Sequence, residues 1–106
     1  MKPTIEVETV YDWGGYHNWT LVLPTTKKHP AQRFWLGQDV KFCNRVLSLS
    51  PSTVQASINI RLGKSTDEPI NLADDKVNTM LADFIIDQLG GLEYVLEQEP
   101  WAFAAQ

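Results

Sequence analysis

Three side chains of this sequence carry the chemistry that most often serves catalysis or metal binding, namely His17, His29 and Cys43. Imidazole and thiol groups act as bases, nucleophiles or ligands where several such groups converge. Here His17 lies beside a predicted turn, His29 lies in a lysine-rich loop, and a lone cysteine is most often a small buried apolar residue. The sequence has no CxxC or HxxxH spacing, no glycine-rich phosphate loop and no nucleophile elbow. It therefore predicts a protein that is not an enzyme and uses no cofactor or metal ion, although the fold could still bring distant carboxylates such as Glu6 and Asp12 together.

The elements that would position these groups begin with a β-hairpin. Apolar and polar residues alternate over residues 4–12 and again over 16–23. The Gly14-Gly15 pair between them tolerates the positive φ angles that tight hairpin turns require. The segment that follows, residues 25–31, has the composition of a loop, with a proline and two adjacent lysines.

The middle of the chain predicts further strands. Residues 33–36 are aromatic and strand-like, and β-branched and aromatic residues favour a strand over 40–49. Apolar residues there also fall at helical spacing, so the sequence does not decide between a helix and a strand over residues 38–50. After a serine–proline turn, apolar and polar side chains alternate without a break over residues 54–62. A helix would turn two of these five apolar side chains, Ala56 and Ile60, to the opposite side, so the pattern predicts a half-buried strand.

The last third of the chain predicts helices. Apolar residues recur at three- and four-residue spacing from a cap at Asp74 or Asp75 to the Gly90-Gly91 pair. A shorter helical turn follows and ends before Pro100. We therefore expect a single α+β domain spanning residues 1–106, with an antiparallel sheet of about five strands covered by a C-terminal amphipathic helix and a short second helix.

Charge is sorted along the chain. Residues 27–64 carry seven Lys or Arg side chains against Asp39 alone, and residues 65–106 carry nine carboxylates against Lys76. Complementary charged surfaces of this kind govern partner choice. On the predicted helix the outward side would show acidic residues, of which Asp83 and Asp87 are candidate contacts for a basic partner.

The apolar tail, residues 100–106, holds two large aromatic side chains. Chain ends are usually polar, so Trp101 and Phe103 are expected to dock, either on their own domain or on another protein or a second copy. They are the candidate interface anchors. We therefore predict a small non-enzymatic interaction or regulatory module that binds a protein partner or itself through its tail and its polarised charge.

A second hypothesis concerns DNA. Residues 47–58, LSLSPSTVQASI, resemble the turn and the start of the recognition helix in LuxR-type helix-turn-helix domains. The resemblance implies a DNA-binding regulator that uses residues 40–62. Ser52, Gln55 and Asn59 would face DNA, and the implied phosphate contacts are Lys41, Arg45 and Arg61. The acidic balance of the whole chain disfavours nucleic acid as the principal partner.

A third hypothesis is a small-molecule pocket. Aromatic side chains gather around the first strands and could line a site for a cationic or apolar ligand. These candidates are Tyr11, Trp13, Tyr16, Trp19 and Trp35.

The expected location is the cytoplasm. The start of the sequence has no basic and apolar leader, and the single cysteine forms no internal disulfide. The apolar runs are much shorter than the roughly 20 residues that span a bilayer, so no membrane role is expected.

Overall fold

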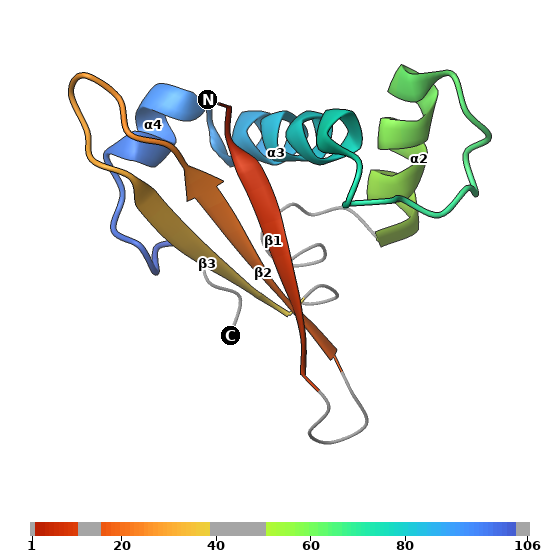
Figure 1. Cartoon of the computed structure of the whole chain (residues 1–106), viewed down its shortest axis with the longest axis horizontal. Coiled ribbons are helices and arrows are strands. Elements are labelled where there is room, and N and C mark those ends of the chain that lie inside the picture. Colours follow the sequence, from red (N-terminus) through yellow and green to blue (C-terminus); the bar gives the residue numbers. More distant parts are fainter. Residues whose placement is uncertain (1, 11–15, 39–50, 104–106) are drawn as a thin grey trace.

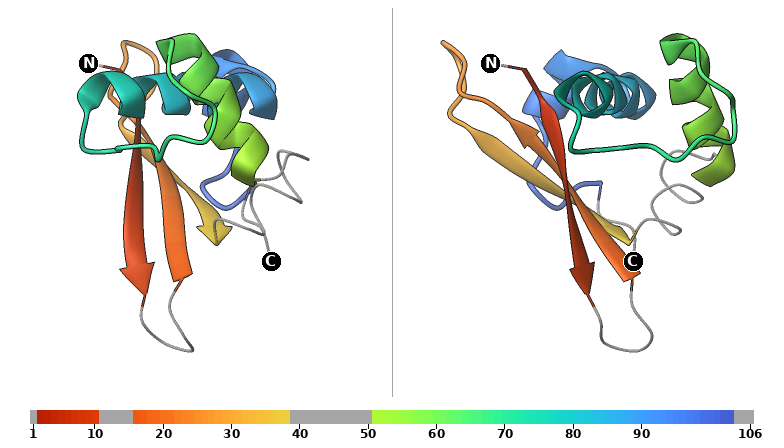
Figure 2. Two further views of the ribbon diagram at one scale, coloured as in Figure 1. Left: turned by 90° about the vertical axis from the view of Figure 1, so that its right-hand side faces the viewer. Right: turned by 45° about the vertical axis from the view of Figure 1, so that its right-hand side comes forward.

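The computed structural model describes residues 2–10, 16–38 and 51–103, and these form an α+β fold. One antiparallel sheet has the strand order β1-β2-β3. Figure 1 shows α2, α3 and α4 in a row across one end of this sheet, and the second view of Figure 2 shows them on one side of it. The element bounds are β1 Thr4–Val10, β2 Tyr16–Leu23, β3 Gln32–Gln38, α2 Pro51–Leu62, α3 Asp75–Leu89 and α4 Leu92–Leu96.

The predicted antiparallel pairing of the first two strands is confirmed. β1 and β2 pair with Ile5 opposite Leu21 and Val7 opposite Trp19. The β3 strand pairs antiparallel with β2, with Phe34 opposite Leu21. Because side chains alternate across a strand, Ile5, Leu21 and Phe34 are buried against the helices.

The prediction of about five strands is wrong for the described residues, which contain three. Residues 54–62, predicted as a strand, belong to the α2 helix. Val54 and Ile58, four residues apart, are buried on one side of this helix, whereas Ile60 is 66% exposed. Proline is favoured at the first helical position, and packing outweighs strand propensity. The predicted strand at 40–49 lies outside the described residues. The choice between helix and strand over 38–50 also lies outside them, apart from residue 38.

The predicted C-terminal helices are confirmed. The Asp74 Oδ1 atom accepts hydrogen bonds from the N–H groups of Lys76 at 2.9 Å and Val77 at 3.4 Å, which caps the start of α3. The helix ends where Gly90 adopts φ 118°. Side chains other than glycine rarely adopt that conformation, so the glycine pair stops α3 and lets α4 turn away.

Candidate interaction surface

The segment that follows α4 returns along the outer edge of β3 (Figure 1). The Trp35 N–H group donates a hydrogen bond to the Pro100 carbonyl oxygen at 3.2 Å. The Pro100 carbonyl carbon is bonded to the nitrogen of Trp101, so this contact brings the backbones of Trp35 and Trp101 next to each other. The two tryptophans are 66 positions apart in the sequence.

Both tryptophan side chains remain in contact with water. Trp35 is 46% exposed and Trp101 is 67% exposed. Trp35 lies on the outer side of β3 because its neighbour Phe34 points into the core. The Ala102 N–H group donates to the Glu99 carbonyl oxygen at 3.0 Å, which closes a turn with Pro100 and Trp101 at its corner. The corner position presents the Trp101 indole to solvent.

The next aromatic residue of the tail turns inward. The Phe103 ring centroid lies 6.0 Å from that of the buried Phe34 and 6.4 Å from that of Tyr94. Tyr94, on α4, is itself 52% exposed. The structure thus packs Phe103 against its own domain and leaves Trp101 exposed. We call the four side chains Trp35, Tyr94, Trp101 and Phe103 the aromatic edge.

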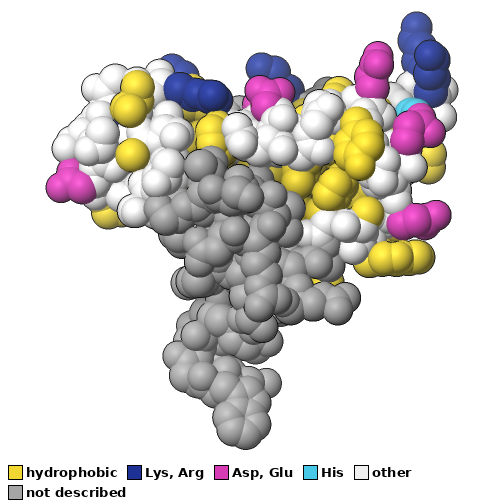
Figure 3. All heavy atoms as spheres, turned by 180° about the vertical axis from the view of Figure 1, so that it is seen from behind, with side chains coloured by type: hydrophobic (Ala, Val, Ile, Leu, Met, Phe, Trp, Pro, Cys, Tyr) yellow, Lys and Arg dark blue, Asp and Glu magenta, His cyan; other side chains and the backbone are white. Residues whose placement is uncertain are grey.

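Acidic side chains border this surface. Glu97 and Glu99 are exposed in the segment between α4 and Trp101. Figure 3, which views the molecule from behind, shows apolar side chains gathered on the α4 side of that face, with Asp and Glu side chains at its margin. Exposed apolar side chains with a polar rim are the usual composition of a protein interface.

On the outer face of the sheet, Arg33 and Glu6 form an ion pair. The Arg33 Nη1 atom donates to Glu6 Oε1 at 3.3 Å, and Nη2 donates to Oε2. This hydrogen bonding lowers the pKa of the Glu6 carboxyl and raises the pKa of Arg33. The pair crosses β2, because Arg33 lies opposite Val22 and Glu6 lies opposite Thr20.

The two predicted acidic contacts lie on α3. Asp83 and Asp87 are exposed, and neither forms an ion pair with another described residue. They are four residues apart and therefore share one side of the helix.

The two tryptophans of the predicted aromatic pocket whose side chains are described lie on opposite faces of the sheet. Trp19 is half-buried and packs against the core, whereas Trp35 lies on the opposite face. Tyr11, Trp13 and the side chain of Tyr16 lie outside the described part of the chain. The two described tryptophans therefore do not line a common pocket.

Three of the six residues that the DNA resemblance implied contact other parts of the protein. Asn59 is only 1% exposed, and its Nδ2 atom donates to the carbonyl oxygens of Thr66 at 3.3 Å and Glu68 at 2.8 Å. Gln55 Nε2 also donates to the Glu68 carbonyl oxygen, at 2.9 Å. The guanidinium of Arg61 lies 5.0 Å from the Phe84 ring centroid. Ser52 is exposed, and Lys41 and Arg45 lie outside the described residues.

Of the three residues with catalytic chemistry, only the His29 side chain lies within the described residues. His29 Nε2 lies 3.5 Å from Glu97 Oε1, and Cys43 and the His17 side chain lie outside the described residues. Within residues 2–10, 16–38 and 51–103, no three His, Cys, Asp or Glu side chains gather into a group that could hold a metal ion.

None of the helices described is long and apolar enough to cross a membrane.

Sequence reasoning missed the aromatic edge as a unit. It assigned Trp35 to a ligand pocket and Trp101 to a separate interface, and it gave Tyr94 no role. The exposure of Tyr94 depends on how α4 packs, which no local pattern reveals.

Comparison with protein-family models, curated proteins and solved structures finds no match to this chain.

Proposed function

We propose that this protein is a small non-enzymatic interaction module that binds another protein, or a second copy of itself, through the aromatic edge. The observation that carries this proposal is the hydrogen bond between Trp35 N–H and the Pro100 carbonyl oxygen, which places the backbones of two exposed tryptophans next to each other. Tryptophan is among the residues most enriched at the energetic centres of protein interfaces.

The backbone around both side chains is held in place. Trp35 belongs to a paired strand, and Trp101 lies at the corner of a closed turn that Phe103 anchors. A partner therefore meets a backbone that needs little further ordering, which lowers the entropic cost of binding. A whole aromatic side chain buries about 150–250 Å², and Trp35 and Trp101 still expose 46% and 67% of their surface to a partner.

The proposed location is the cytoplasm. A single cysteine among 106 residues fits a reducing compartment, where disulfides seldom persist.

The test compares two variants that each remove one exposed apolar side chain. Trp101→Ser alters the aromatic edge, and Ile60→Ser alters α2, where Ile60 is 66% exposed. The mass of each purified protein in solution is measured by light scattering over a range of concentrations. Affinity capture from a lysate of the source cells, quantified by mass spectrometry, is run in parallel.

The proposal expects self-association, or one defined captured protein, that Trp101→Ser abolishes and Ile60→Ser preserves. If all three proteins are monomeric and capture the same proteins, the aromatic edge is not a binding surface.

A further inference from the structure

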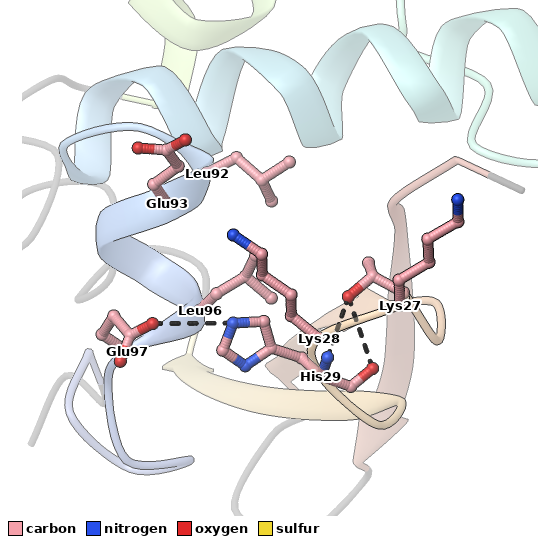
Figure 4. A pocket seen from close by; sticks show the side chains of 8 residues that line it. Lys27, Lys28, His29, Leu92, Glu93, Leu96 and Glu97 are labelled. Carbon is pink, nitrogen blue, oxygen red and sulfur yellow. Dashed lines mark hydrogen bonds and ion pairs between the residues drawn. The ribbon is translucent and has the colours of Figure 1, made fainter.

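A cleft of about 610 Å³ separates the loop between β2 and β3 from α4. Loop residues Thr26 to His29 form one wall. Leu92, Glu93 and Leu96 of α4 form the other wall together with Glu97, the residue that follows the helix (Figure 4). Small-molecule sites typically have volumes of about 300–1,000 Å³. The cleft is therefore large enough for a small ligand.

The loop wall is a closed turn. The Thr26 N–H group donates to the His29 carbonyl oxygen at 2.9 Å, and the His29 N–H group donates to Thr26 Oγ1 at 3.0 Å. Lys27 and Lys28 occupy the two corners of this turn. Their ammonium groups are thus displayed from a backbone whose geometry is fixed by hydrogen bonds.

The helix wall is apolar at its centre. Leu92 and Leu96 are four residues apart, so they lie on the same side of α4. At one end of the cleft, His29 Nε2 lies 3.5 Å from Glu97 Oε1 and connects the two walls (Figure 4). The Glu97 carboxylate faces this imidazole at the end of the cleft, and the exposed Glu93 carboxylate also lines the helix wall.

The two lysines differ in direction. In Figure 4 the Lys28 side chain extends toward Leu92 and Leu96, whereas Lys27 diverges from it. Neither ammonium group forms an ion pair with another described residue. An anionic group placed beside Lys28 would gain a charge-assisted hydrogen bond that the protein itself does not supply there.

We propose that this cleft binds a small amphipathic anion, with its carboxylate or sulfonate on Lys28 and its apolar body on Leu92 and Leu96. Lys27 contributes only longer-range attraction. This site is distinct from the aromatic edge, because its lining contains none of the four side chains of that edge, although Glu97 borders both.

The experiment uses the full-length protein and the anionic, apolar dye 1-anilinonaphthalene-8-sulfonate as the probe. Fluorescence titrations give the dissociation constant for the wild type, Lys28→Ala, Lys27→Ala and Leu92→Asn. Circular dichroism confirms that each variant is folded, since this dye also binds partly unfolded chains. Two-dimensional NMR locates the bound dye through shifts of the backbone amides.

We expect saturable binding that weakens as salt is added. Lys28→Ala should weaken dye binding about tenfold or more, because a hydrogen bond to a charged group contributes about 1.5–3 kcal/mol. Leu92→Asn should weaken it by a similar factor, because it removes apolar contact with the body of the dye. The matched Lys27→Ala should weaken it no more than about threefold. Amide shifts should concentrate in residues 26–29 and 92–97.

Failure of this proposal is distinguishable from failure of the proposed function. Trp101→Ser should leave dye binding unchanged, so dye binding that this variant abolishes would assign the dye to the aromatic edge and overturn the cleft site. Absence of saturable binding, or equal loss in Lys27→Ala and Lys28→Ala, would also overturn it.

Discussion

The side-chain amide of Asn78 on α3 pairs with both backbone polar groups of Ile5 on β1. Asn78 Oδ1 accepts from the Ile5 N–H group at 2.8 Å, and Asn78 Nδ2 donates to the Ile5 carbonyl oxygen at 2.8 Å. The same Nδ2 atom donates to the Leu72 carbonyl oxygen at 3.1 Å. One amide thus takes the place of a neighbouring strand and fastens the long helix to the edge of the sheet.

Asn78→Ala should therefore lower the free energy of unfolding by about 1–3 kcal/mol, because it leaves partly buried backbone groups of Ile5 without partners. Gln88→Ala removes an exposed amide from the same helix and should change stability by less than about 0.5 kcal/mol. Urea denaturation followed by circular dichroism measures both. Equal effects of the two substitutions would show that the Asn78 hydrogen bonds do not stabilise the fold.

Asn59→Ala should destabilise the protein and loosen the loop that follows α2. The buried amide holds the carbonyl oxygens of Thr66 and Glu68, and losing a buried hydrogen-bonding group costs about 1–3 kcal/mol. Trypsin should then cleave faster after Lys64. Gln55→Ala, which loses one hydrogen bond to Glu68, is the milder comparison. Unchanged stability and cleavage in Asn59→Ala would show that the Asn59 hydrogen bonds do not hold the loop.

The ion pair of Glu6 and Arg33 should make stability depend on acid pH. Because Arg33 lowers the pKa of Glu6, the pair contributes stability above the ordinary pKa of a glutamate, and that contribution is lost as pH falls through the lowered pKa. NMR titration of the Glu6 carboxyl carbon should show a midpoint that rises in Arg33→Gln. Lys76→Gln, on α3, should leave it in place. A midpoint unmoved by Arg33→Gln would contradict the ion pair.

The two aromatic residues of the tail should behave differently when they are removed. Phe103→Ala loses the contacts with Phe34 and Tyr94 and should cost about 1–2 kcal/mol, since Phe103 is only partly buried. Trp101→Ser changes an exposed side chain and should alter stability by less than about 0.5 kcal/mol. Thermal denaturation separates the two outcomes. A large loss of stability in Trp101→Ser would place Trp101 among the residues that hold the fold.

Local signals were sufficient where local interactions decide the structure. The alternation around residues 5–9 and 19–23 predicts two paired strands, because the period of two matches the pleat and the neighbouring strand comes next along the chain. The α3 helix was predictable for a similar reason. Its cap at Asp74 and its stop at Gly90 are formed by residues adjacent to the helix itself.

Residues 54–62 show where local patterns fail. Their alternation of apolar and polar side chains is typical of a strand, yet these residues belong to α2. In the helix, Val54 and Ile58 pack into the core and Asn59 hydrogen-bonds the following loop. The sequence also reveals that Trp35 and Trp101 are large and apolar, but not that they lie together. The hydrogen bond from Trp35 N–H to the Pro100 carbonyl oxygen brings their backbones together. By itself, then, the sequence determined the α+β class, the hairpin strands and the capped helix, whose signals are local. Only the tertiary structure decided α2, the aromatic edge and the cleft beside α4, because each depends on contacts between distant parts of the chain.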